Sequence, residues 1–279
     1  MLMCTMAILF KAARNTPVLV AANREERFDR PTHPPKIQSG TPRVVCGIDR
    51  KAGGTWFGVN QHGLVAAVTN RPKTLVPSDP RSRGLLCREL LDLSTATEAA
   101  QYAAEELASG LYAGANYFCA DADSAAVVYG GNRIEVVELQ PGLHLLTNGD
   151  LNDPRDQRQE FLLRMFTLHT LDSAVTFLAV ASRAFSRKPD VAGRRGVVST
   201  GGEHGTVSST LLSLSEKIQH CIYQYAPGPP SDHPYDDLSA LLRQVLSTDK
   251  SRNRLQDEDE DKDEDEFDDE FEDLDDDVE

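Results

Sequence analysis

The stretch CTMAILFKAARNTPVLVAANREE, residues 4–26, consists of two apolar runs joined by a short polar segment. The runs Thr5–Phe10 and Pro17–Asn23 are rich in residues that favour strands, and the Arg14-Asn15 pair between them is typical of a turn. The stretch therefore predicts a β-hairpin. Such a hairpin would bring Cys4, which precedes the first strand, near the polar residues that follow the second.

Cys4 and Arg24 together suggest a reactive thiol. A cysteine at a protein's own N-terminus can act as a nucleophile, while its α-amine, with a pKa near 8, serves as the base. A guanidinium on the neighbouring strand would lower the pKa of the thiol and favour the thiolate. Cys4 is equally compatible with a small buried side chain on an edge strand, so the residues alone leave both interpretations open.

The rest of the chain divides into strand-rich and helical segments. Short apolar runs with turn signals predict strands at Arg43–Ile48, Thr55–Val59, Leu64–Thr69, Ala115–Ala120, Ala125–Tyr129, Arg133–Glu138, Leu143–Thr147, Thr206–Leu214 and Lys217–Tyr225. Apolar periodicity and the capping box Thr95-x-x-Glu98 predict helices at Arg81–Leu93, Thr95–Ser109, Asp153–His169, Leu171–Phe185 and Tyr235–Leu246. This segregated order predicts an α+β fold, a sandwich of two sheets with helices on each side.

The charge of the chain is concentrated at one end. Residues 257–279 contain 18 Asp or Glu residues and one lysine, a charge of −17, so the remainder carries +2 of the total of −15. The near-neutral body argues against nucleic-acid binding. We expect a single domain over residues 3–247 and a disordered acidic tail over 248–279, with docking to a basic partner as the alternative role of the tail.

The cysteines and the apolar runs indicate a cellular compartment. Five widely spaced cysteines do not form a disulfide framework and are typical of reduced thiols in the cytosol. No run reaches the eighteen or so apolar residues that a membrane span requires, and Met1–Phe10 does not fit a secretory signal. We therefore expect a cytoplasmic protein without a membrane span.

Motifs for metals and nucleotides are missing from the sequence. Neither H-E-x-x-H nor C-x-x-C occurs, so no metal site and no cofactor is predicted. The run Gly53–Gly58 superficially resembles a phosphate-binding loop. It leads into a predicted strand, whereas a phosphate cradle opens a helix, so nucleotide binding is disfavoured.

Asparagines recur at predicted strand ends. Asn23 with Arg24, Asn70 with Arg71, and Asn148 each follow an apolar run, and a single asparagine there is ordinarily a turn residue. The repeat of Thr-Asn at 69–70 and 147–148 is harder to explain in this way. Gathered in one site, such amides could donate to a developing oxyanion, a contribution of about 3 kcal/mol.

The order of several segments resembles the NRDE (Asn-Arg-Asp-Glu) family, also called transport and Golgi organisation 2-like. The resemblance covers about Met3 to Leu214. The segments that carry it are Met3-Cys4-Thr5, Val20–Glu26 with Arg30-Pro31, Ala52–Gly58, Asn60-x-x-Gly63 leading to Val68–Arg71, Arg81–Leu86, Leu143–Asn148 and Thr206–Leu214.

Through this family the chain is similar, more distantly, to choloylglycine hydrolases and penicillin acylases of the N-terminal-nucleophile superfamily. That similarity implies a four-layer αββα sandwich and hydrolysis of a linear, non-peptide amide C–N bond through an acyl-thioester. It implies catalytic roles for Cys4, with its thiol as nucleophile and its α-amine as base, and for Glu25, which falls near the catalytic Asp of the hydrolases. Asn70 and Asn148 would be oxyanion or positioning groups. Supporting or substrate-binding positions would be Asn23, Arg24, Gly54, Thr55, Trp56 and Arg71.

Three features depart from the family pattern. Position 25 is Glu where the family has Asp, and Val207 stands where relatives usually carry Arg. Met1-Leu2-Met3 precede Cys4, and we expect Met1 to be retained before Leu2, whereas initiation at Met3 would make Cys4 the second residue. The expected ligand is a small acylated or hydrophobic molecule. The alternative to hydrolysis is a non-catalytic protein of the same fold that binds a lipid or haem.

Overall fold

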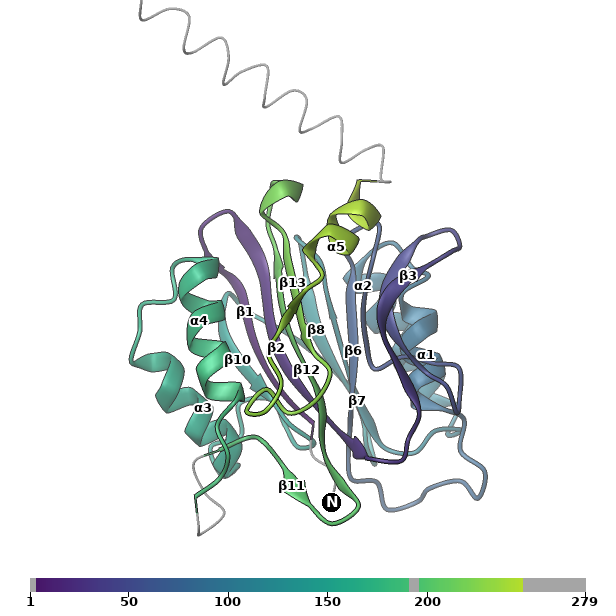
Figure 1. Ribbon diagram of the computed structural model, residues 1–279. Helices are drawn as coiled ribbons and strands as arrows, with labels where there is room; N and C mark the ends of the chain where they lie inside the picture. Colours follow the sequence, from purple (N-terminus) through teal and green to yellow (C-terminus); the bar gives the residue numbers. More distant parts are fainter. Residues whose placement is uncertain (1–3, 191–195, 248–279) are drawn as a thin grey trace, which may run out of the picture.

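The computed structural model describes residues 4–190 and 196–247. Within them, two antiparallel sheets of seven strands pack face to face, and helices cover the outer face of each sheet (Figure 1). The predicted αββα sandwich is therefore confirmed. The acidic tail at 248–279 and the residues Met1-Leu2-Met3, for which we made predictions above, lie outside the described residues.

The first sheet has the strand order β10-β1-β2-β12-β13-β14, with β11 paired to β12. Its strands are β1 (Thr5–Ala13), β2 (Thr16–Arg27), β10 (Gly142–Leu146), β11 (Thr200–Gly201), β12 (His204–Leu214), β13 (Ile222–Ala226) and β14 (Asp236–Asp237). The predicted hairpin is β1–β2, and Asn15 adopts a φ of 52° in its turn, a conformation that asparagine tolerates.

The second sheet runs in chain order from β3 to β9. Its strands are β3 (Thr32–Gln38), β4 (Val44–Asp49), β5 (Phe57–Asn60), β6 (Val65–Asn70), β7 (Ala115–Ala120), β8 (Ala125–Gly130) and β9 (Ile134–Glu138). Because its neighbours are consecutive in the chain, this sheet is a simple meander. The cavity described below lies near the C-terminal ends of β2 and β6.

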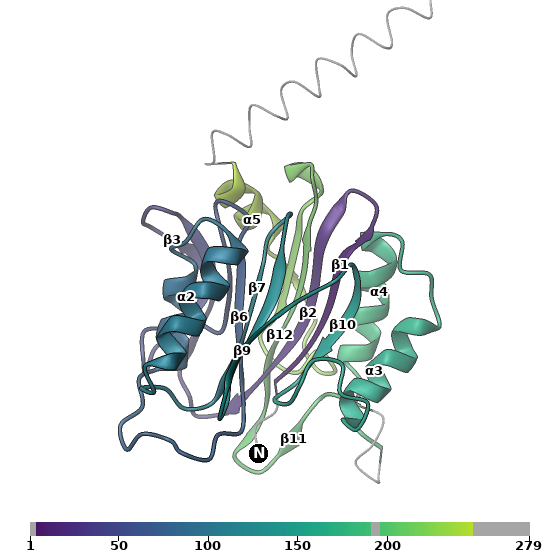
Figure 2. The same cartoon turned by 180° about the vertical axis from the view of Figure 1, so that it is seen from behind.

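Each sheet has its own helical layer. The helices are α1 (Arg83–Leu90), α2 (Ala96–Ala108), α3 (Gln157–Thr167), α4 (Ala174–Phe185) and α5 (Ser239–Leu246). Viewed from behind, α2 covers the second sheet and α3 and α4 cover the first (Figure 2). None of these helices has the length and apolar content needed to cross a bilayer.

Three apolar cores lie between the four layers. The run Met6–Phe10 of β1 is continuously apolar because it contributes to two of them. Met6, Ile8 and Phe10 face the core between the sheets, whereas Ala7 and Leu9 face the core beneath α3 and α4. In that outer core the rings of Phe166 and Phe177 stack with centroids 5.2 Å apart. Because both faces of this segment are buried, apolar residues occupy successive positions, and the alternation typical of a half-exposed strand is absent.

The structure corrects several element boundaries. Three strands were not predicted: β3, β11 and β14. The strand β3 contains Pro34-Pro35, and prolines argue against a strand. The two prolines are tolerated because β3 is an edge strand, paired only with β4 among the described residues. The segment predicted as one strand, Lys217–Tyr225, begins with a 3-10 helix at Ile218–His220 before β13.

Helix starts were predicted less well than helix interiors. The Thr95 capping box is confirmed, with both of its hydrogen bonds present. The third predicted helix begins at Gln157, four residues after Asp153, because the Asp156 carboxylate accepts from the backbone of Arg158 and Gln159 and so caps the helix there. Likewise, the last helix begins at Ser239, since β14 occupies the residues before it.

Candidate functional site

A cavity of about 290 Å³ opens beside the start of β1, between the ends of the two sheets and the N-terminal turn of α1. Cys4, Arg24, Trp56 and Asn70 line it, together with the segment 80–84 that leads into α1. With Glu25 and Thr55, which also line it, six of the residues predicted from sequence share this cavity. Arg30 and Asp49, for which the sequence predicted no role in the site, also line the cavity.

Cys4 faces this cavity because of its place in the hairpin. Thr5 pairs with Asn23 and Met6 with Ala22, so Cys4 lies opposite Arg24, on the same strand face as Met6. The Cys4 Sγ accepts a hydrogen bond from the backbone N–H of Glu25 at 3.5 Å. Burial raises the pKa of the Cys4 thiol, and this outweighs the lowering effects of that N–H and of Arg24. Arg24 acts in the predicted direction, yet the thiol stays protonated at neutral pH.

Arg24 is only 8% exposed and stacks on the indole of Trp56, with its guanidinium carbon 4.1 Å from the ring centroid. It also forms an ion pair with Glu26 at 3.5 Å. Glu26 lies 3.8 Å from Arg30, which donates to the Asp49 carboxylate at 3.1 Å from its Nε. A line of alternating charges therefore forms one wall of the cavity.

The Glu25 carboxylate lies on the other face of β2. It accepts a hydrogen bond from the Thr206 hydroxyl at 2.6 Å and lies 4.0 Å from Arg158 of α3. Burial raises the pKa of Glu25 to about 7. Asn23, two residues earlier, donates from the same face to the Phe185 carbonyl of α4 at 3.0 Å. Only the backbone of Glu25 contacts the thiol, so the structure does not bring its carboxylate to Cys4.

The glycine-rich loop before β5 positions Trp56. A Cβ on Gly54 would lie 2.1 Å from the Gly84 carbonyl carbon, and the Thr55 N–H donates to the Gly84 carbonyl at 2.9 Å. The buried Thr55 hydroxyl donates to the Phe57 carbonyl. Gly54 and Thr55 therefore hold the loop against α1. In this position the loop places the Trp56 ring where the Arg24 guanidinium stacks on it.

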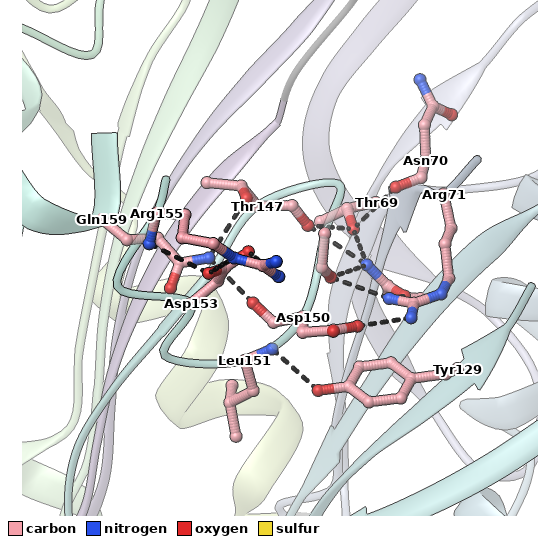
Figure 3. Close-up of polar contacts among 12 residues, drawn as sticks. Thr69, Asn70, Arg71, Tyr129, Thr147, Asp150, Leu151, Asp153, Arg155 and Gln159 are labelled. Atoms are coloured by element: carbon pink, nitrogen blue, oxygen red, sulfur yellow. Dashed lines mark hydrogen bonds and ion pairs between the residues drawn. The ribbon is translucent and has the colours of Figure 1, made fainter. Parts of the chain in front are cut away.

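Asn70 and Arg71 are adjacent but point to different places. Asn70 ends β6 and lines the cavity, and its amide extends away from the groups around Arg71 (Figure 3). The Arg71 guanidinium donates to Asn116 Oδ1 at 3.1 Å, to the Gly149 carbonyl at 2.9 Å and to Asp150 at 2.5 Å. It also stacks on Tyr129 at 4.1 Å. Arg71 thus holds protein groups together, an arrangement compatible with the supporting part of the predicted supporting or substrate-binding role.

Asn148 belongs to the loop that Arg71 fixes. The Thr69 hydroxyl donates to the Thr147 carbonyl at 2.9 Å, and Gln159 of α3 donates to the Asp150 carbonyl at 2.9 Å (Figure 3). Asn148 is 3% exposed and follows β10, the strand beside β1. It does not line the cavity that holds Cys4 and Asn70.

Val207, which stands where relatives usually carry Arg, does not lie in the cavity. Thr206 pairs with Glu25 and Ser208 with Arg24, so Val207 is the extra residue of a β-bulge in β12. It does not line the cavity, whose most buried cation is Arg24 of β2. Over residues 4–190 and 196–247, His, Cys, Asp and Glu side chains form no group of three that could hold a metal ion.

The segment Arg81-Ser82-Arg83-Gly84 is the main part of the cavity that sequence reasoning missed as a site. It contributed to the family resemblance, but no role was predicted for it. The pattern of two arginines bracketing the Ser82 N-cap of a helix could have drawn attention to it, since both line the cavity. The sequence does not show that Arg81 forms ion pairs with Glu89 and Glu106, because these contacts depend on the fold.

Comparison with solved structures supports the fold. The chain is similar to penicillin V acylase from Agrobacterium tumefaciens, with a TM-score of 0.52 and 14% sequence identity over 85% of this chain and 86% of that one. At this identity the similarity concerns the fold, which is that of the N-terminal-nucleophile hydrolases.

Sequence comparison identifies the family. The family model for Transport and Golgi organisation 2 matches residues 3–223. The Transport and Golgi organization 2 homolog of Mus musculus is 32% identical over 146 residues, 49% of this chain and 52% of that protein. The Bos taurus homolog is 33% identical over the same shares. The chain spans about half the length of these relatives. The family match covers most of the body of the chain, and the protein belongs to the Transport and Golgi organisation 2 family.

Proposed function

We propose that the protein is an amidohydrolase in which Cys4 is the nucleophile that cleaves a linear C–N amide bond in a small acylated substrate. The observation that carries the proposal is that the Cys4 thiol and the Asn70 amide line one polar cavity at the end of an N-terminal-nucleophile fold. A cavity of about 290 Å³ suits a small molecule better than a polymer.

The reaction requires a base, because burial raises the pKa of the Cys4 thiol. In the proposed reaction Cys4 is the first residue, and its α-amine takes the thiol proton. Sγ then forms a bond with the substrate carbonyl carbon, the C–N bond breaks, and the proton passes to the departing amine. Water hydrolyses the resulting thioester, releasing a carboxylic acid and restoring the thiol.

Asn70 is the proposed oxyanion donor. Its amide makes no hydrogen bond to the described residues and is therefore available to a ligand in the cavity. An amide N–H aimed at the developing oxyanion contributes about 3 kcal/mol to such reactions. The Glu25 N–H, which donates to Sγ, holds the thiol in place during the attack.

The second candidate is a non-catalytic binding protein of the same fold. The placement of the Glu25 carboxylate favours it, since that group contacts Thr206 on the far face of β2 and does not contact the thiol. The charged lining of the cavity is better suited to a small polar ligand than to haem or a long lipid chain.

The test compares the full chain with a chain that begins at Cys4, each incubated with short-chain N-acyl amides. Mass spectrometry would measure the released amine and locate any acyl adduct. The proposal expects turnover and an adduct at Cys4 in the shorter chain, with neither in its Cys4→Ala variant. The buried thiols of Cys46, Cys87, Cys119 and Cys221 are internal controls. Binding without turnover in the shorter chain would favour the non-catalytic candidate.

A further inference from the structure

The cavity contains a guanidinium, that of Arg83, for which the described residues supply no counter-ion. Arg83, the first residue of α1, lines the cavity and donates from Nη1 to the Gly114 carbonyl at 3.1 Å. Within the part of the chain that the structure describes, Arg83 forms no ion pair. Arg81 also lines the cavity but forms ion pairs at 2.6 Å with both Glu89 and Glu106. The two arginines on this wall therefore differ in charge balance.

The cations that β2 and the following turn contribute to the cavity are balanced by carboxylates. Arg24 and Arg30 share Glu26, and Arg30 also pairs with Asp49. The remaining carboxylate near the cavity, Glu25, contacts Thr206 and Arg158 on the other face of β2. Among the described residues that line the cavity, no carboxylate therefore forms an ion pair with Arg83.

Arg83 is also held in a fixed position. The Tyr117 hydroxyl donates to the Arg83 carbonyl at 3.0 Å, which fixes the backbone at the start of α1. The acceptor of its side chain, the Gly114 carbonyl, belongs to a tightly packed segment, because a Cβ on Gly114 would lie 2.1 Å from the Arg71 carbonyl oxygen. The guanidinium is thus oriented before any ligand arrives, which reduces the entropy lost on binding.

We propose that Arg83 is a specificity-determining residue that binds an anionic group, a carboxylate or a phosphate, on the small acylated ligand of this cavity. The planar fork of a guanidinium matches both anions with paired hydrogen bonds. The inference rests on the proposed function only in taking the cavity as the ligand site. Arg24, stacked on Trp56 and paired with Glu26, lines the same cavity but is already balanced, which leaves Arg83 as the cation for the ligand.

The experiment measures binding in the full chain carrying Cys4→Ala, so that no turnover is needed. The probes are N-hexanoylglycine, its phosphate counterpart N-hexanoyl-O-phosphoethanolamine, and the neutral N-hexanoylglycinamide. Titration calorimetry would give each dissociation constant with Arg83 intact, with Arg83→Gln and with Arg83→Lys. Arg14→Gln serves as the matched control, because Arg14 is 84% exposed and lies in the β1–β2 turn.

We expect Arg83→Gln to weaken binding of the preferred anionic probe about 10- to 100-fold while leaving the neutral probe unchanged. Arg83→Lys should retain part of the affinity, and Arg14→Gln should have no effect. The stronger of the two anionic probes identifies the anion as carboxylate or phosphate. Equal losses for charged and neutral probes, no loss, or no binding of either anionic probe would overturn the inference.

The outcome is separable from that of the proposed function. Arg83-dependent binding of an anionic probe without hydrolysis by the chain beginning at Cys4 would refute the amidohydrolase and leave the anion site standing. Hydrolysis of charged and neutral probes at similar rates, unaffected by substitution of Arg83, would support the amidohydrolase and refute the anion site.

Discussion

Arg24 and Arg71 both stack on an aromatic ring at 4.1 Å, yet their surroundings differ. Arg71 donates hydrogen bonds to Asn116, Gly149 and Asp150, although its side chain is 18% exposed. Arg24 is more buried at 8%, and its only ionic contact among the described residues is Glu26 at 3.5 Å. The more deeply buried cation thus has the fewer partners.

The difference distinguishes a structural arginine from one available to a ligand. A buried charge is costly unless its donors are satisfied, and the bonds of Arg71 meet that requirement within the protein. The donors of Arg24 face a cavity that also contains Cys4 and Arg83. Substitutions at and around the two arginines should separate these two roles.

Gly54→Ala should destabilise the fold by about 3 kcal/mol, because the new Cβ would meet the Gly84 backbone, which cannot rotate away. The change should also displace Trp56, the platform for Arg24. Urea unfolding would measure the loss. Gly201→Ala is the control, since nothing lies within 4 Å of a Cβ there. Similar unfolding midpoints for the two variants would show that the close approach at Gly54 is unimportant.

Glu25, on the opposite face of β2 from Arg24, should make stability depend on pH. Its pKa is raised from 4.5 to about 7 in the folded protein, so the unfolded chain loses the proton first as the pH rises. Stability should therefore fall between pH 4.5 and pH 7, by at most about 3 kcal/mol, and level off above that. Unfolding of wild type and Glu25→Gln across this range isolates the contribution. A constant difference between the two proteins would contradict the prediction.

Arg71→Met should cost about 2 kcal/mol of unfolding free energy, because it leaves the Gly149 carbonyl and Asn116 Oδ1 without this donor. The 147–151 loop should become more accessible, which hydrogen exchange at its amides would show. Unchanged exchange in that loop would mean that Thr69 and Gln159 hold it without help from Arg71.

Arg24→Met should change the unfolding free energy by less than about 1 kcal/mol, since methionine can cover Trp56 without burying a charge. Trp56 is the sole tryptophan, so its fluorescence reports directly on the loss of the cation. The contrast with Arg71 would fail if the Arg24 variant were as unstable as the Arg71 variant.

The layers of the fold follow from sequence more directly than the site does. Strand segments buried on both faces, such as Met6–Phe10 of β1 and Ala125–Tyr129 of β8, appear as continuous apolar runs, and α2 is marked by its capping box. The edge strand β3 was missed because its prolines oppose strand formation, whereas pairing with β4 and packing of Ile37 on the central core, both tertiary contacts, stabilise it.

Within the site, the outcome depended on which way each side chain points. We expected the strand containing Asn23 and Arg24 to end there, but β2 continues to Arg27. In an extended strand, alternate residues face opposite sides, so Arg24 points to the cavity while Asn23 and Glu25 point to the helices. The sequence could not distinguish Arg83 from Arg81. Both are about equally far along the chain from Glu89 and Glu106, and only the fold shows that Arg81 forms the ion pairs with them.

The polar bond between Thr69 and Thr147 bears on how the cavity could change shape. On the β10 side of Cys4, a hydrogen bond of 2.9 Å joins the two sheets, and such bonds tolerate little change in length or direction. On the β2 side, the corresponding contact is a guanidinium lying on an indole, which can slide without losing its attraction. Accommodation of a bulkier ligand would therefore be one-sided, with Trp56 and Arg24 yielding while the Thr147 loop keeps its place.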